Sequence, residues 1–170
     1  MKLSLRPSRA AAILALLLLT GAATPAPPLV FPEVDHILVA KAARTLTLYG
    51  VDGSVSVIEH IQLGDAPVGA KRFEGDERTP EGRFVIDYGN PDSAYHLSLH
   101  IAYPRPQDTA FARQQGRSPG GLIFIHGQPN EWPVGRVPGD WTDGCIAVSD
   151  EQIEALWDAV PDGTPIEIVP

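Results

Sequence analysis

Alternation of apolar and polar side chains predicts a series of short β-strands after residue 34. A half-buried strand alternates with period two because successive side chains point to opposite faces. The predicted strands, which include one continuous apolar run at 122–125, are residues 35–40, 45–49, 55–63, 84–86, 95–103, 122–125 and 166–169. Asp52-Gly53 is a hairpin-turn signal between the second and third strands. Residues 64–82 are rich in glycine, proline and charge, which indicates a loop.

Two short helices are predicted among these strands. Ser149 and Gln152 have the spacing of a capping box at the start of a helix. One apolar face follows at helical spacing, made of Ile153, Leu156, Trp157 and Val160. Residues 108–115 form a second short helix that ends at Gly116. The sequence therefore predicts a mostly-β domain, sandwich-like or barrel-like, with seven to nine strands and two short helices.

The N-terminus has the order of a secretory signal peptide. Lys2, Arg6 and Arg9 precede an apolar run at 10–19, and small residues follow. This run is shorter than the roughly 20 apolar residues of an ordinary membrane span. We therefore expect a signal peptide at 1–23, a linker at 24–34 and one domain at 35–170, exported to the periplasm or cell envelope. An uncleaved N-terminal anchor is the alternative.

Composition narrows the possible partners and cofactors. The net charge of −8 and the absence of a basic stripe argue against nucleic-acid binding. His96 and His100 lie on one predicted strand, roughly 13 Å apart at the rise of a β-strand, too far to share one metal ion. No phosphate-binding glycine loop is present. We expect no cofactor and no metal, and a monomer because no repeat or heptad is visible.

A single cysteine and a histidine carry the candidate chemistry. Cys145 is the only cysteine, so it is either a reactive or intermolecularly bridged thiol, or a small buried apolar group. His126 follows the apolar run at 122–125, and a neighbouring imidazole can activate a thiol by taking its proton. A backbone carbonyl near Gly127 can orient the imidazole. The amides of Gly144 and Cys145 can face a developing oxyanion.

The arrangement of these residues resembles the L,D-transpeptidase catalytic domain family (YkuD-type). The family motif is a histidine, then about fifteen to eighteen residues, then Ser/Thr-His-Gly-Cys followed by a hydrophobic residue and Asn or Arg. This chain has His126-Gly127 and, from 142 to 147, Thr-Asp-Gly-Cys-Ile-Ala. Residues 79–84, Thr-Pro-Glu-Gly-Arg-Phe, resemble a second family segment. The resemblance extends from Asp35 to the end of the chain.

This resemblance implies a β-sandwich-like fold and action on peptidoglycan stem peptides. In the family, the cysteine attacks the carbonyl of the third residue, usually a diamino acid, and the terminal D-amino acid leaves. An amine from a second stem, or from a wall-linked lipoprotein, then resolves the acyl-enzyme. Carried over to this chain, Cys145 is the nucleophile and His126 the base. The Gly127 carbonyl orients the base, and the amides around Asp143 and Gly144 form the oxyanion hole.

Two departures from the motif keep other activities open. Asp143 replaces the usual His, and Ala147 replaces the usual Asn or Arg. A carboxylate beside a forming thiolate raises the thiol pKa, unless it faces outward toward the ammonium of a diamino-acid substrate. The alternatives are an L,D-carboxypeptidase or an amidase that cuts wall or wall–protein links, a non-catalytic wall-binding module, and a zinc peptidase.

The sequence also predicts roles for several further residues. His96, Trp141 and Thr142 are the predicted substrate contacts. The aromatic residues expected in the core rather than at a ligand are Tyr95, Tyr103 and Trp157. Residues 76–78, Asp-Glu-Arg, are expected to form a solvated turn.

Overall fold

Eight strands and two helices make up the described part of the chain, residues 27–170 of a computed structural model. The predicted signal peptide and the first residues of the predicted linker lie outside these residues. The strands are β1 (Val34–Ala40), β2 (Thr45–Gly50), β3 (Val55–Glu59), β4 (Gly82–Asn90), β5 (Ser98–Ile101), β6 (Ile123–His126), β7 (Ile146–Ala147) and β8 (Pro165–Val169). The helices are α1 (Pro106–Gln114) and α2 (Asp150–Ala159). The predicted mostly-β fold with two short helices is confirmed.

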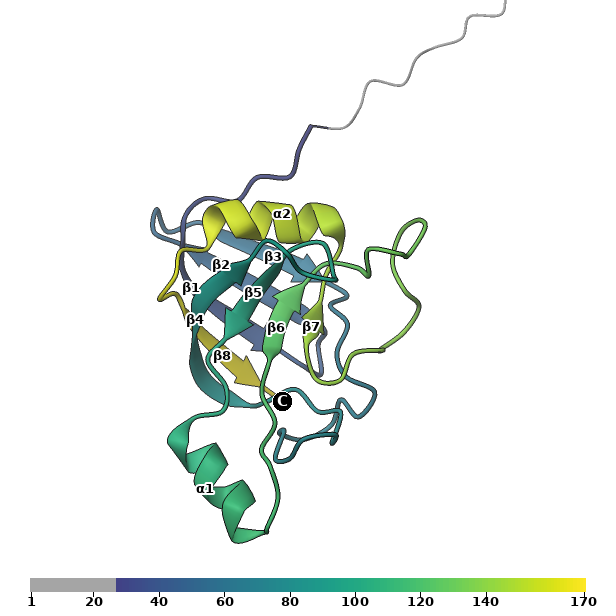
Figure 1. Ribbon diagram of the computed structural model, residues 1–170. Helices are drawn as coiled ribbons and strands as arrows, with labels where there is room; N and C mark the ends of the chain where they lie inside the picture. Colours follow the sequence, from purple (N-terminus) through teal and green to yellow (C-terminus); the bar gives the residue numbers. More distant parts are fainter. Residues whose placement is uncertain (1–26) are drawn as a thin grey trace, which may run out of the picture.

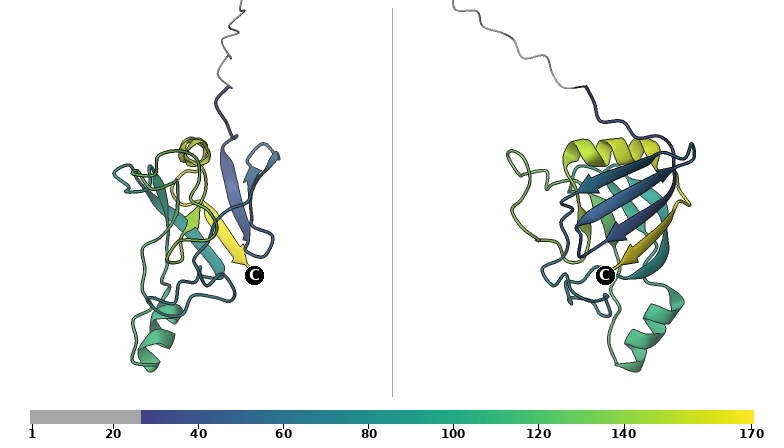
Figure 2. Two further views of the ribbon diagram at one scale, coloured as in Figure 1. Left: turned by 90° about the vertical axis from the view of Figure 1, so that its right-hand side faces the viewer. Right: turned by 180° about the vertical axis from the view of Figure 1, so that it is seen from behind.

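One sheet curls on itself to form the two layers of the fold (Figure 2, left). The strand order is β3-β2-β1-β8-β4-β5-β6-β7. The β1–β8 and β6–β7 pairs are parallel, and the other pairs are antiparallel. Strand β4 joins the layers, because its first residues pair with β8 and its last residues pair with β5. The short pair β6–β7 therefore lies at one end of the sheet order.

The hydrophobic core lies between the two layers. Helix α2 lies across one end of these layers (Figure 1). Ile153 and Leu156 on α2 are fully buried, as the helical periodicity predicts. The predicted capping box starts this helix: Ser149 Oγ accepts a hydrogen bond from the Gln152 amide (3.2 Å), and Gln152 Oε1 accepts one from the Ser149 amide (2.9 Å). Helix α1 projects at the opposite end from α2 (Figure 1).

The structure corrects the predicted strand at 95–103. Only Ser98–Ile101 is a strand, because the backbone turns at His96, whose φ is +66°. A residue in this left-handed region cannot continue an extended strand. The predicted third strand also ends earlier, at Glu59, and β4 extends further, to Asn90. Strand β7 has no predicted counterpart, since two residues are too few to show a period.

Two long connections lie beside the β6–β7 end of the sheet. Residues 60–81 connect β3 to β4, and residues 127–145 connect β6 to β7. An isolated bridge between Gln62 and Ala147 attaches the first connection to β7, and another between Gly64 and Thr142 attaches it to the second connection. The described residues include no helix with the length and hydrophobicity of a membrane span.

Candidate active site

Parallel pairing of β6 with β7 brings His126 and Cys145 together from positions far apart in the chain. The register pairs Ile125 with Ile146, so Cys145 lies level with Phe124, two residues before His126. Side chains on one face of a strand recur every second residue. Phe124, His126 and Cys145 therefore share a face, with the Cα atoms of His126 and Cys145 roughly 8 Å apart by strand spacing and rise.

A single cavity opens over this face of the sheet. Its volume is about 480 Å³. The residues of its wall come from the end of β4, the segment before β5, strand β6, and the turn before β7. We call this cavity the cleft; it is lined by Asn90, Ser93, Ala94, Tyr95, Ser98, Gly121, Leu122, Ile123, Phe124, His126, Trp141, Thr142, Asp143 and Cys145. Both halves of the predicted Cys–His pair thus open into one solvent-accessible space.

The Gly127 carbonyl orients the His126 ring. It lies 2.7 Å from Nδ1, and since a carbonyl only accepts hydrogen bonds, Nδ1 carries the proton. Nε2 is then the unprotonated nitrogen and the available base. Tyr95 and Trp141 pack on the ring at centroid distances of 4.5 and 5.5 Å. Burial lowers the pKa of His126 to about 4, although the bond to Gly127 opposes this shift, so the ring is neutral at pH 7.

The Cys145 thiol is partly exposed, and it forms hydrogen bonds with strand β6 and with Leu122, the residue that precedes this strand. The Phe124 amide donates to Sγ at 3.4 Å, and Sγ donates to the Leu122 carbonyl at 3.5 Å. Burial raises the pKa of Cys145 to about 11; the charge of Asp143 adds to this shift, while the Phe124 amide and the charge of Lys71 oppose it. No hydrogen bond joins Sγ to His126. The pair is therefore a neutral thiol and a neutral imidazole, with the proton still on sulfur.

A tight turn at 142–145 presents the thiol. Thr142 Oγ1 donates to the Cys145 carbonyl (2.8 Å) and accepts from the Gly144 amide (3.2 Å). The Thr142 side chain is thus buried within the turn and stabilises it. The sequence predicts that the Gly144 amide donates to an oxyanion, but in the structure this amide already donates to Thr142 Oγ1. The amides of Asp143 and Cys145 donate to no other described residue and are the available pair.

The backbone of the 71–79 segment supports this turn from behind. Gly144 has a φ of +122°, and a Cβ on it would lie 2.4 Å from the Arg78 carbonyl oxygen. A Cβ on Gly64 would lie 2.0 Å from the Glu77 carbonyl oxygen and 2.9 Å from the Gly144 nitrogen. Only glycine fits at both positions. The Cys145 turn is therefore in direct backbone contact with the residues that precede the Thr-Pro segment.

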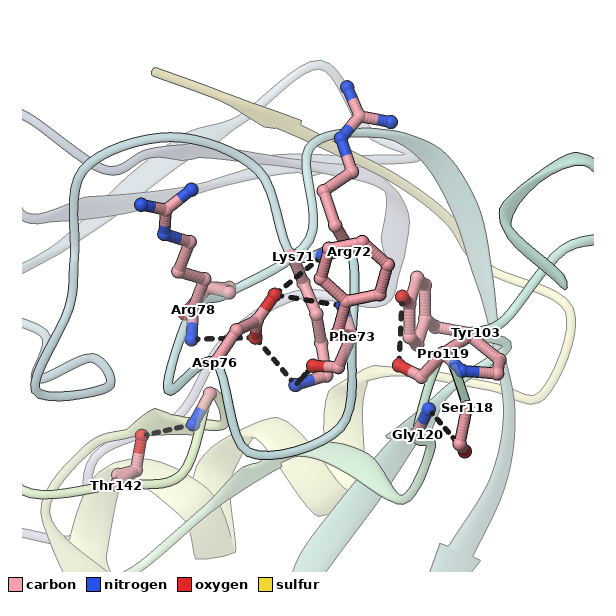
Figure 3. A network of polar contacts seen from close by, with 12 residues as sticks. Lys71, Arg72, Phe73, Asp76, Arg78, Tyr103, Ser118, Pro119, Gly120 and Thr142 are labelled. Carbon is pink, nitrogen blue, oxygen red and sulfur yellow. Dashed lines mark hydrogen bonds and ion pairs between the residues drawn. The ribbon is translucent and has the colours of Figure 1, made fainter. Parts of the chain in front are cut away.

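Asp76 holds the 71–79 segment in shape (Figure 3). Its carboxylate accepts hydrogen bonds from the amides of Arg72 (2.6 Å), Phe73 (2.9 Å) and Arg78 (3.2 Å), and from Lys71 Nζ (2.9 Å). Burial alone would raise the pKa of Asp76, but these donors hold it below its usual value. Lys71 is buried. The expectation that residues 76–78 form a solvated turn is therefore wrong for Asp76.

The connection between His126 and Cys145 is held by a buried glutamine that the sequence did not single out. Gln128 Nε2 donates to the Val148 carbonyl (2.6 Å), and Gln128 Oε1 accepts from the Val137 amide (2.8 Å). Asp140 accepts from the Leu63 amide at 2.9 Å. These polar contacts fix the inner part of the connection, while its outer part exposes Trp132 and Val134.

Of the predicted substrate contacts, Trp141 lines the cleft and His96 does not. Trp141 lines the cleft, and its Nε1 is buried without a hydrogen-bond partner. His96 is not part of the cleft wall; its Nε2 lies 2.7 Å from Glu154 Oε1 on α2. Tyr95, expected in the core, is 40% exposed and lines the cleft instead. Tyr103, in contrast, is buried in the core as expected.

Within residues 27–170, no group of three or more His, Cys, Asp or Glu side chains is arranged to hold a metal ion. His100 Nδ1 hydrogen-bonds with Asp87, and His96 Nε2 hydrogen-bonds with Glu154, so each of these two histidines is in hydrogen-bond contact with one carboxylate.

Comparisons with known proteins identify the family and the fold. The sequence model of the L,D-transpeptidase catalytic domain family (YkuD) matches residues 34–168 of this chain. The helical cell shape determining protein Pgp2 from Campylobacter jejuni is similar in structure, with a TM-score of 0.62 and 27% identity over 81% of this chain and 48% of that chain. Bd1075 of Bdellovibrio bacteriovorus gives a TM-score of 0.53 and 25% identity over 81% and 48% of the two chains.

An L,D-transpeptidase from Mycobacterium smegmatis shares the fold at 19% identity, with a TM-score of 0.51 over 81% of this chain and 59% of that one. The chain spans about half the length of the Pgp2 and Bd1075 structures. The comparison with curated proteins gives no match.

Proposed function

Because the chain belongs to the L,D-transpeptidase catalytic domain family, we propose that it is an exported cysteine acyltransferase that acts on peptidoglycan stem peptides. The observation that carries this proposal is the common cleft of His126 and Cys145, on one face of paired strands. The hydrogen bond from Nδ1 to the Gly127 carbonyl and the burial of the ring leave His126 Nε2 unprotonated. The β6–β7 register puts His126 on the same wall of the cleft as the thiol.

Acylation begins with a proton transfer from Cys145 Sγ to His126 Nε2. The sulfur attacks the carbonyl carbon of the third residue of a donor stem, and the carbonyl oxygen becomes an oxyanion. The amides of Asp143 and Cys145, which donate to no other described residue, donate to this oxyanion. Collapse of the tetrahedral intermediate breaks the peptide bond. His126 returns the proton to the leaving amine, the terminal D-amino acid departs, and a thioester remains on Cys145.

Deacylation repeats these steps with a new nucleophile. An amine from a second stem, or from a wall-linked lipoprotein, attacks the thioester while His126 takes its proton. The new amide is the crosslink, and the thiolate recovers the proton from His126. If water takes the place of the amine, the same acyl-enzyme gives a tripeptide, and the enzyme is an L,D-carboxypeptidase. A wall-binding module would form no acyl-enzyme.

The proposed place of action is the periplasm or cell envelope. The N-terminal order of basic, apolar and small residues in 1–23 supports export. The similarity to a protein described as helical cell shape determining supports a role in cell shape through the wall. The family domain supports peptidoglycan as the material acted upon.

Product analysis tests the proposal. The chain is incubated with a defined tetrapeptide stem, alone and with an excess of a second stem as acceptor, and the products are separated by mass. We expect crosslinked peptide and free D-amino acid from the native chain and neither from Cys145→Ala. Tripeptide without crosslinks would reassign the enzyme as a hydrolase. Equal product from the Cys145→Ala variant would overturn the cysteine mechanism.

A further inference from the structure

The cleft carries one negative side chain and no positive one. Among the residues that line it, Asp143 is the one carboxylate, none is a lysine or an arginine, and burial keeps His126 neutral. The Asp143 side chain is exposed and makes no hydrogen bond or ion pair with another described residue. Its two neighbours in sequence, Thr142 and Gly144, are buried in the turn. The carboxylate is therefore held by a rigid backbone and is open to a ligand.

The aromatic part of the cleft wall also favours a positive ligand. The rings of Tyr95 and Trp141 lie 5.7 Å apart and both line the cleft. Aromatic faces are negative and attract ammonium groups. Trp141 is two residues before Asp143, so the rings and the carboxylate belong to one wall. Two independent features thus point to a cationic group.

The position of Asp143 has a cost for the thiol. Its charge adds to the burial that raises the pKa of Cys145, and so it opposes formation of the thiolate. An ammonium group paired with Asp143 would cancel most of that charge. The same pairing that binds a cationic ligand would then favour deprotonation of Cys145.

From the exposed carboxylate and the neighbouring aromatic rings we propose that Asp143 is a specificity-determining residue. Its carboxylate pairs with a side-chain ammonium on the acyl donor. This inference rests on the proposed function, since the donor is the peptide that acylates Cys145. The Cα atoms of Asp143 and Cys145 are separated by about 7 Å at most, the reach of two residues. A lysine-like side chain on a four-carbon stem can span that separation from an acylated carbonyl. Donor binding and thiol activation are then coupled through one carboxylate.

Two donors that differ only in the ammonium test the inference. The third residue of the stem is lysine in one and norleucine in the other, and quenched reactions give the rate of Cys145 acylation by intact-protein mass. We expect the native chain to prefer the lysine donor by about fivefold or more at low salt, with a smaller preference at 1 M salt. In Asp143→Asn the preference falls to near one.

Matched variants separate this role from others. Glu131→Gln removes an exposed carboxylate on the same connection outside the cleft, and it keeps the native preference. Asp143→Glu retains part of it. Equal rates for the two donors in the native chain, or an unchanged preference in Asp143→Asn, would overturn the inference and leave the proposed function standing. Acylation by neither donor would overturn both.

Discussion

The backbone amide of Phe124 donates a hydrogen bond to Cys145 Sγ across 3.4 Å, and this contact ties the thiol to the strand that ends in His126. The amide favours the thiolate, yet burial outweighs it and raises the pKa of Cys145 to about 11. The thiol is therefore protonated at neutral pH, and in the proposed mechanism it loses its proton only after a donor has bound. A thiol in this state is protected from adventitious reaction, since the thiolate is the reactive form.

Alkylation of the free enzyme should report this protonation state. At pH 7 we expect iodoacetamide to label Cys145 roughly a hundredfold more slowly than a free cysteine of ordinary pKa. The rate should keep rising with pH beyond 10. A plateau near pH 7 would show a preformed thiolate, which the structure does not support. The unfolded chain, labelled in denaturant, is the control for reagent quality.

Replacement of His126 by Gln should remove the base while keeping a polar side chain. We expect acylation by a stem peptide to fall by about 10²–10⁴-fold, the usual contribution of a general base. Thermal unfolding checks that the variant is folded. A folded His126→Gln variant that acylates at the native rate would assign proton removal to another group.

The neutral, buried His126 should make stability depend on pH in the acid range. Its pKa is about 4 in the folded state and 6.5 in the reference state, so the unfolded chain binds more protons between these values. Stability is therefore lost as pH falls from about 6.5 to about 4, by about 3 kcal/mol from this residue. Denaturant unfolding of the native chain and of His126→Gln gives the measurement. The variant should show a flatter curve in this window.

Addition of one methyl group at Gly144 should damage the site directly. Gly144 has a φ of +122°, and a Cβ there would lie 2.4 Å from the Arg78 carbonyl oxygen. We expect Gly144→Ala to reduce the free energy of unfolding by about 2–4 kcal/mol and to abolish acylation. Gly135→Ala is the control, because Gly135 also has a positive φ (+70°) but has open space around it. It should cost only about 1–2 kcal/mol and retain activity.

Loss of the Asp76 carboxylate should weaken the support behind the Cys145 turn. Asp76→Ala removes four hydrogen bonds and leaves the buried Lys71 ammonium without its counter-charge. We expect a destabilisation of about 3 kcal/mol and a fall in acylation rate. Glu74→Ala, an exposed carboxylate in the same segment, should change stability by less than about 0.5 kcal/mol. Similar losses in the two variants would show that Asp76 has no special role.

Local signals predict the elements that neighbours in sequence stabilise. The capping box of Ser149 and Gln152 starts α2 where its residues indicate, and the Asp52-Gly53 turn joins β2 and β3. Both depend on contacts within a few residues. The Cys145–His126 assignment came from a motif, but the register that places the two on one face depends on β7, a strand too short to show a pattern.

Residues governed by distant contacts escape such signals. Tyr95 fits an alternating strand, yet the backbone turns at His96 and places the Tyr95 ring over His126 at the cleft. The sequence predicts Asp76 to be a solvated charge, because the amides that donate to its carboxylate come close to it only when the segment is folded. His96 shares a predicted face with Ser98, but the same turn directs its ring to Glu154 on α2.

The mass of the quenched enzyme tests the central claim most directly. The native chain is mixed with a tetrapeptide stem, stopped in acid within the first turnovers, and digested to locate any adduct. The account predicts an added mass equal to the donor minus its terminal D-amino acid, carried by the peptide that contains Cys145. Release of the D-amino acid with no adduct on Cys145, or undiminished release by Cys145→Ala, would contradict it.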